Sequence, residues 1–173
     1  MPPSTDDFAR ALVAPGPTDA HPKRMATFGR LVGTWQVHNA FLSEETHEWT
    51  ETDRSWIFSY VLGGRAVQDV LLGADGGAGS DEVAGSTMRV YDPAAGMWRI
   101  SWFGTLTGDY CTLAGTAHKR DGIRQDGTQT DGRPIRWNFS DITDDSFAWD
   151  GWVSDDDGRT WWLEQHMDAA RVR

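Results

Sequence analysis

Residues 87–118 read TMRVYDPAAGMWRISWFGTLTGDYCTLAGTAH, and this stretch decides the fold. It contains three segments rich in β-branched and aromatic residues, at 87–91, 97–103 and 109–118. The segments are joined by two short turn sequences, DPAAG and LTG. Short turns between consecutive strands are typical of antiparallel hairpins. The sequence therefore predicts a three-stranded antiparallel meander here.

The same two-residue alternation of apolar and polar side chains continues on both sides of this stretch. Further strands are expected at 35–41, 55–62 and 66–72 before it, and at 135–139, 147–153 and 159–167 after it. A weaker strand is punctuated by the turn pairs Asp121-Gly122, Asp126-Gly127 and Asp131-Gly132. A glycine-rich polar stretch over residues 73–86 is expected to be a connection.

About nine or ten strands therefore follow one another, with no helical pattern between them. A meander of this length exposes two strand edges unless it closes, and closure into an up-and-down barrel removes both edges. The predicted fold is all-β: a single up-and-down antiparallel β-barrel of about ten strands. A two-sheet sandwich is the alternative, but sandwiches normally use longer Greek-key connections than this chain provides.

Two short helical segments are expected before the strands. Residues 1–21 are predicted to form a leader with one short helix, which Ser4 or Thr5 could cap. A second helix is expected over residues 22–31, where the apolar side chains recur at helical spacing. We expect this helix to plug one end of the barrel domain, which spans residues 22–173.

The net charge of −10 excludes several kinds of partner. Nucleic acids and anionic membrane surfaces both attract clustered Lys and Arg, so neither partner is expected. No apolar run reaches the roughly 20 residues that span a bilayer, and the first residues are acidic where a signal peptide is basic. The single cysteine, Cys111, forms no internal disulfide. The sequence predicts a cytoplasmic protein, and a homodimer is compatible with it.

The first expected strand opens with Gly33-Thr34-Trp35, directly after the second expected helix. This arrangement resembles the opening of the lipocalins and of the wider calycin group. The resemblance implies that Trp35 closes the base of the barrel. It also implies that an arginine near the chain end, Arg171 or Arg173, lies across the indole in a cation–π contact.

Several further motifs occur in order along the chain. They are Leu62-Gly63-Gly64-Arg65, Tyr91-Asp92-Pro93, Ser146-Phe147 with Trp149, and SDDDGRTW at 154–161. Together with Gly33-Thr34-Trp35, this set resembles a bacterial family of small lipocalin-like proteins of unassigned function, over most of residues 20–173. The final HMDAARVR is more distantly similar to nitrobindin-like barrels, where the histidine binds heme iron. Arg171 stands where that pattern has an apolar residue, so no cofactor is predicted.

Ten tryptophans occur in the chain, none before residue 35. Several lie on rows that are expected to face the barrel interior, where they either fill the core or line a pocket. The candidates for ligand contact are Trp56, Trp102, Trp137 and Trp149. Such a pocket would suit a small, apolar or aromatic metabolite through stacking and burial of apolar area. Binding of such a ligand is the predicted function.

Polar side chains on the same strands provide the second set of candidates. Those that could contact a ligand are Tyr60, Arg65, Gln68 and Tyr110. The alternative function is a cofactor-independent enzyme of secondary metabolism, such as a cyclase, isomerase or dehydratase. In that case Asp69 and His166 are the candidates for proton transfer, with Tyr60 and Arg65 orienting a substrate oxygen. A bulge near Gly63-Gly64 would exchange the faces of Gln68 and Asp69.

Motifs for other chemistry are missing from the sequence. No nucleophile elbow or phosphate-binding loop is present. The five histidines do not follow the spacing of a metal site. Glu164 and His166 are expected to share a strand face, but two ligands do not make a site, so no metal is predicted.

Overall fold

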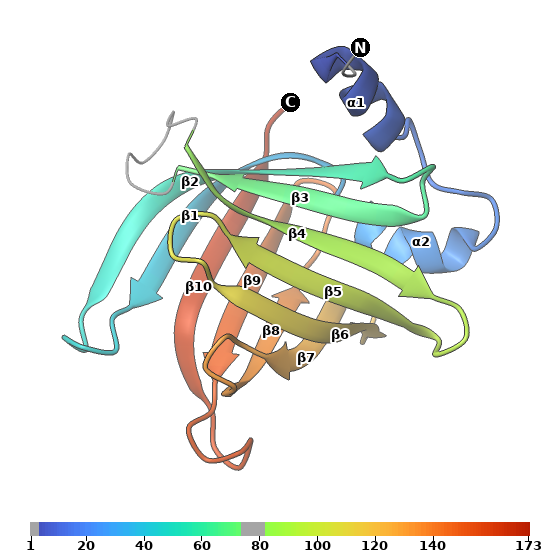
Figure 1. Ribbon diagram of the computed structural model, residues 1–173. Coiled ribbons are helices and arrows are strands. Elements are labelled where there is room, and N and C mark those ends of the chain that lie inside the picture. The colour runs from blue at the N-terminus through green and yellow to red at the C-terminus, as the bar shows by residue number, and fades with distance from the viewer. Residues whose placement is uncertain (1–3, 74–81) are drawn as a thin grey trace.

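Ten antiparallel strands form a closed barrel in the computed structural model, which describes residues 4–73 and 82–173 (Figure 1). The strands are β1 (Gly33–Leu42), β2 (Trp49–Val61), β3 (Ala66–Leu72), β4 (Val83–Asp92), β5 (Met97–Gly104), β6 (Tyr110–His118), β7 (Gly122–Thr128), β8 (Pro134–Ser140), β9 (Ser146–Val153) and β10 (Trp162–Arg171). Each strand pairs with its neighbours in the chain, and β1 pairs with β10 to close the ring. The predicted up-and-down barrel is confirmed, and the two-sheet alternative is wrong.

Several strand boundaries differ from the sequence prediction, among them the start of β2 at Trp49 instead of residue 55. β4 begins at Val83, so only part of the expected 73–86 connection is a loop, and residues 74–81 lie outside the described residues. β10 begins at Trp162 instead of residue 159, because the Asp156 carboxylate accepts hydrogen bonds from the backbone N–H and the hydroxyl of Thr160, both at 2.7 Å. These bonds hold the segment before β10 as a loop.

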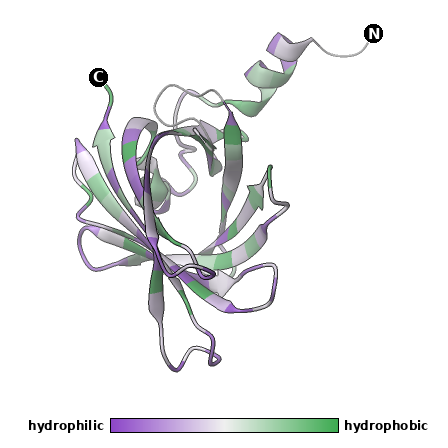
Figure 2. Ribbon diagram, turned by 90° about the vertical axis from the view of Figure 1, so that its left-hand side faces the viewer, coloured by the Kyte–Doolittle hydropathy of each residue, from purple (hydrophilic) through white to green (hydrophobic). Residues whose placement is uncertain are grey.

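The inward rows of the barrel follow from the strand register. Hydrophobic and hydrophilic residues alternate along the strands (Figure 2). Trp35 is paired with Trp56, and Phe139 is paired with Trp149, so each pair projects from the same face of the sheet. Buried side chains at alternate positions of β1, β2, β8 and β9 confirm that this face is the interior.

Helix α2 (Pro22–Gly29) closes one end of the barrel. Pro22 occupies the first turn, where a missing N–H costs nothing. Met25 and Phe28 are the buried residues of the helix, and Phe28 packs edge-on against Trp98 with ring centroids 4.9 Å apart. The predicted helical plug is therefore confirmed.

The base of the barrel is held together by Trp35 and Arg171. The guanidinium of Arg171 lies 4.0 Å from the centroid of the fully buried Trp35 ring. The same guanidinium donates to the carbonyl oxygens of Val32 and Arg30, at 2.8 and 3.0 Å. The cation–π contact implied by the lipocalin resemblance is confirmed for Arg171, whereas Arg173 instead pairs with Asp145 at 2.7 Å.

Gly33 is required at this base for two reasons. Its φ of +136° is rarely adopted by residues with a side chain. A Cβ at this position would also lie 2.3 Å from Nη1 of Arg171. The Gly-x-Trp motif thus supplies both the indole and the space for the arginine that covers it.

Helix α1 (Thr5–Leu12) lies outside the barrel (Figures 1 and 2). Ser4 caps it, and Ser4 and Asp7 form a reciprocal capping box. The helix is joined to the barrel where Leu62 N–H donates to the Leu12 carbonyl at 2.9 Å. Among the described residues, neither helix is long and apolar enough to cross a lipid bilayer.

Candidate functional site

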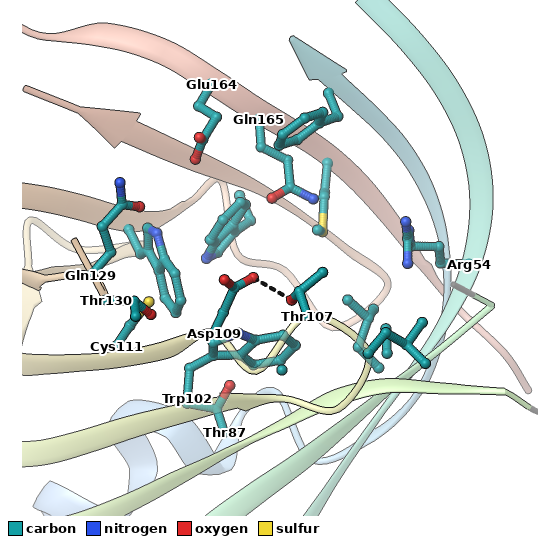
Figure 3. Close-up of a pocket in the computed structure, with 18 of the residues that line it drawn as sticks. Arg54, Thr87, Trp102, Thr107, Asp109, Cys111, Gln129, Thr130, Glu164 and Gln165 are labelled. Carbon is teal, nitrogen blue, oxygen red and sulfur yellow. Dashed lines mark hydrogen bonds between the residues drawn. The ribbon is translucent and has the colours of Figure 1, made fainter. Parts of the chain in front are cut away.

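The barrel contains a cavity of about 670 Å³ at the end opposite α2 (Figure 3). Its rim includes the β5–β6 turn, with Thr107 and Asp109, and the β7–β8 turn, with Asp131 and Arg133. Both turns lie at the far ends of strands whose other ends meet α2, so the cavity opens away from the plug. Its walls are inward-facing side chains from most strands of the barrel.

Four tryptophans line this cavity: Trp56, Trp102, Trp137 and Trp149. Their rings meet edge to face. The centroids of Trp102 and Trp137 are 6.3 Å apart with planes at 82°, and those of Trp137 and Trp149 are 5.6 Å apart at 60°. Trp56 and Trp149 also pack edge to face, at 6.2 Å. The four indoles therefore form one continuous aromatic wall, which leaves ring faces and edges open to a ligand.

A buried ion pair lies on the α2 side of this wall, at the floor of the cavity. Arg89, on β4, is paired with Asp69, on β3, at 2.5 Å, and both side chains are at most 2% exposed. The second oxygen of Asp69 accepts from the Thr87 backbone N–H at 3.0 Å. The Arg89 guanidinium also lies 5.1 Å from the Phe28 ring centroid and 5.4 Å from that of Phe58. Arg89 therefore joins the floor of the cavity to the apolar plug.

Asp69 is not among the residues that line the cavity, because its carboxylate is engaged by Arg89 and by the β4 backbone. The register of β3 turns Asp69 inward and Gln68 outward. The sequence had left open which of these two residues faces the barrel interior, because a bulge near Gly63-Gly64 would exchange them. Gln68 donates to the Ser86 hydroxyl at 3.0 Å on the outer face. Neither residue lies where a ligand in the cavity would touch it.

A carboxyl group in the cavity wall has an unusual pKa. Burial, together with the nearby charges of Glu44, Asp109 and Asp131, raises the pKa of Glu164 to about 7 against the opposing charge of Arg133. Arg133 does not neutralise Glu164 because it is engaged elsewhere in ion pairs. Its partners are Glu44 at 2.6 Å, Asp131 at 2.7 Å and Asp155 at 2.9 Å.

The replacement Glu164→Gln is expected to flatten the pH dependence of stability between about pH 4.5 and 7. Because the pKa of Glu164 is higher in the folded protein than in the unfolded chain, folding holds this proton more tightly. The resulting stability is complete below pH 4.5 and is lost as the pH rises through about 7. The glutamine does not ionise, so the variant should be more stable than the wild type at about pH 8, by on the order of 2 kcal/mol.

Urea unfolding of the wild type and of Glu164→Gln, at about pH 4.5 and at about pH 8, measures this difference in stability. Glu45→Gln, at an exposed position in the β1–β2 turn, is the matched control and should leave the pH profile unchanged. Identical pH profiles for the wild type and Glu164→Gln would contradict the assignment.

Glu164 and His166 do not share a face, contrary to the sequence prediction. The register between β9 and β10 shifts between Leu163 and Gln165, so that Glu164 lines the cavity and His166 lies on the outer face. Nδ1 of His166 lies 2.7 Å from the Asp150 carboxylate, and Nε2 lies 3.3 Å from that of Asp168.

Burial opposes the charged form of His166, but the hydrogen bond and charge of Asp150 and the charge of Asp168 outweigh it and raise the pKa of the imidazole. The ring is thus held on the outside by two carboxylates. It fits neither a heme bound inside the barrel nor a proton-transfer partner for Asp69. Among residues 4–73 and 82–173, no group of three or more His, Cys, Asp or Glu could hold a metal ion.

The remaining predicted ligand contacts also lie away from the cavity. Tyr60 faces inward but at the α2 end, beside Gly29, where burial raises the pKa of its hydroxyl. Arg65 is exposed in the β2–β3 turn. Tyr110 is 45% exposed on the outer face and packs against Phe103 with centroids 5.2 Å apart. Of the ten predicted site residues, the four tryptophans are the ones that line the cavity.

Several cavity residues were missed by the sequence analysis. Arg89 lies at an inward position between Met88 and Val90, and an arginine on the core face of a strand was the signal to notice. Cys111 also lines the cavity, where burial, and then the charges of Asp109, Glu164 and Asp131, raise the pKa of its thiol to about 12. The thiol is therefore protonated and not a nucleophile near neutral pH.

The solved structures that are similar to this barrel include the following two. The crystal structure of Rv2717c from M. tuberculosis matches with a TM-score of 0.62 and 14% sequence identity, covering 91% of this chain and 99% of that one. The S-type phycobiliprotein lyase CPES from Guillardia theta matches with a TM-score of 0.61 and 11% identity, covering 90% and 99%. At these identities the likeness shows the fold alone. No family model and no curated protein matches the sequence.

Proposed function

We propose that this protein binds a small, largely apolar or aromatic metabolite inside the barrel. The observation that carries the proposal is the cavity of about 670 Å³ with its wall of four indoles. Ligand pockets typically have volumes of about 300–1,000 Å³ and combine apolar walls with a few polar groups. The polar groups here include Arg54, Thr87 and Gln165. The similar barrel of a phycobiliprotein lyase is compatible with ligand binding in this fold.

The neutral fluorescent probe N-phenyl-1-naphthylamine is expected to bind saturably and to quench tryptophan emission. Trp102→Ala should weaken this binding by about 1–3 kcal/mol, because the indole supplies a large apolar contact. It should destabilise the empty protein by less than the 3–5 kcal/mol that is typical of a core truncation, since one side of the ring faces the cavity. Titration by fluorescence and unfolding in urea measure the two effects.

Trp49→Ala is the matched control, because Trp49 is 47% exposed and does not line the cavity. It should leave probe binding unchanged. If no probe binds and Trp102→Ala unfolds the protein, the tryptophans are core residues and the proposed function is wrong.

A cofactor-independent enzyme of secondary metabolism is the second candidate. The observation that favours it is Glu164, since a carboxyl in a cavity wall with a pKa of about 7 can donate or accept a proton near neutral pH. Glu164 takes the place of Asp69 and His166 in this hypothesis. A ligand recovered unchanged after incubation supports binding alone. A ligand that is converted by the wild type but only bound by Glu164→Gln supports the enzyme.

A further inference from the structure

The floor of the cavity offers hydrogen-bond donors that the described residues do not satisfy. Trp56 lines the cavity and is 4% exposed, and its buried Nε1 has no hydrogen-bond partner among residues 4–73 and 82–173. Nε of Arg89, another buried cavity residue, is likewise without a hydrogen-bond partner in the described chain. A buried donor without an acceptor is unfavourable, so such groups call for an explanation.

Trp56 and Arg89 pack against the same two aromatic rings. The Trp56 ring packs against Phe58 and Phe139, with centroids 4.8 and 5.8 Å apart. The Arg89 guanidinium lies over the same two rings, at 5.4 and 5.9 Å. Phe58 and Phe139 therefore contact both side chains below the aromatic wall. Trp56 and Arg89 also both line the cavity, so a ligand that reaches its floor meets both of them.

Two arginines, Arg54 and Arg89, line this side of the cavity. Arg54 precedes Trp56 by two residues on β2, on the same inward face, and lines the cavity. Figure 3 shows Arg54 on the β2 side, away from Glu164. Arg89 is paired with Asp69, and Arg54 contributes a second guanidinium to the cavity wall. Donors and a cation on one side favour an oxygen acceptor, and most strongly a carboxylate.

We propose that the ligand is an aromatic compound carrying an acceptor oxygen, a carboxylate or a carbonyl, which accepts from Trp56 Nε1 at the cavity floor beside Arg89 and Arg54. This inference rests on the proposed function and names its ligand class. The indole wall holds the ring system, and the floor donors orient it. The acceptor also supplies the hydrogen bond that Trp56 lacks within the described chain.

Three compounds of nearly equal shape test this inference: 2-naphthoate, 2-acetylnaphthalene and 2-isopropylnaphthalene. Each is titrated in competition with N-phenyl-1-naphthylamine at about 0.15 M salt, where long-range repulsion from the acidic surface is screened. Both oxygen-bearing compounds should bind at least about tenfold more tightly than the hydrocarbon, the usual effect of one buried hydrogen bond. If naphthoate binds more tightly than the ketone, the acceptor group of the natural ligand is a carboxylate. If the two bind equally, the acceptor group is a carbonyl.

Two variants locate the acceptor. Trp56→Phe keeps an aromatic ring but removes the N–H, so it should reduce the preference for both oxygen-bearing compounds by about tenfold. Arg54→Gln should weaken naphthoate alone. Trp137→Phe is the matched control in the upper wall, and it should weaken all three compounds by the same factor.

Equal affinities of the three compounds for the wild type would overturn the inference and leave the proposed function standing. Failure of every compound, including N-phenyl-1-naphthylamine, would overturn the proposed function itself. Should Trp56→Phe not fold, the wild-type series still decides. In a folded Trp56→Phe, loss of the preference for the oxygen-bearing compounds supports an acceptor at Trp56 Nε1, and retention of that preference overturns it.

Discussion

Asp69→Asn is expected to lower the free energy of unfolding by about 3–5 kcal/mol, because it leaves the charge of Arg89 buried without its counter-ion. Arg89→Met should cost a similar amount through the unpaired Asp69 carboxylate. The double replacement Asp69→Leu with Arg89→Met should recover most of the loss, since apolar side chains often substitute for a buried ion pair at little cost. Urea unfolding of the three variants measures these differences.

Asp53→Asn provides the control, because Asp53 pairs with His38 at 3.1 Å on the exposed surface. Surface pairs contribute at most about 1 kcal/mol, so this variant should differ little from the wild type. If Asp69→Asn were as mild as Asp53→Asn, the Asp69–Arg89 pair would not be structural. Asp69 would then be free for the proton transfer that the sequence had suggested.

Trp35→Ala is expected to destabilise the barrel by about 3–5 kcal/mol. The replacement removes a fully buried indole, its hydrogen bond from Nε1 to the Leu31 carbonyl at 2.7 Å, and the surface on which Arg171 lies. Trp35→Phe should cost less, because it keeps a ring beneath the guanidinium. Urea unfolding, followed by near-ultraviolet circular dichroism, reports the loss.

A second arginine–tryptophan contact separates burial from the cation–π interaction. Arg136 lies 4.2 Å from the Trp161 ring centroid, in a partly exposed position. Trp161→Ala should cost only about 0.5–1 kcal/mol, the usual value of such a contact near the surface. Equal losses for Trp35→Ala and Trp161→Ala would show that the barrel base does not depend on the buried indole.

The barrel could be predicted because its strands alternate cleanly and its turns are short. The same alternation placed the four cavity tryptophans on the inner face. It also placed Tyr60 on that face, but it gave no information on depth, and Tyr60 lies at the α2 end. Position along the barrel axis depends on the stagger of ten strands, which no single strand encodes.

The polar part of the site could not be predicted for a different reason. Asp69 and Arg89 are 20 positions apart in a chain of many charged residues, and only the β3–β4 register brings them together. Glu164 reaches the cavity through an irregularity in β10 that has no sequence signature. Local patterns therefore locate apolar faces well, whereas polar partnerships depend on pairings between strands.

The pairing of β1 with β10 has a consequence for the folding reaction. Nine of the ten strand pairings join neighbours along the chain and can form as local hairpins, but the seam that places Trp35 opposite Arg171 joins the first strand to the last. Such long-range closure is slow, so we expect folding on a timescale of about milliseconds to seconds. Until the seam closes, β1 and β10 each present an unpaired edge, and partly folded chains can associate through these edges. The yield of refolding should therefore fall with rising protein concentration.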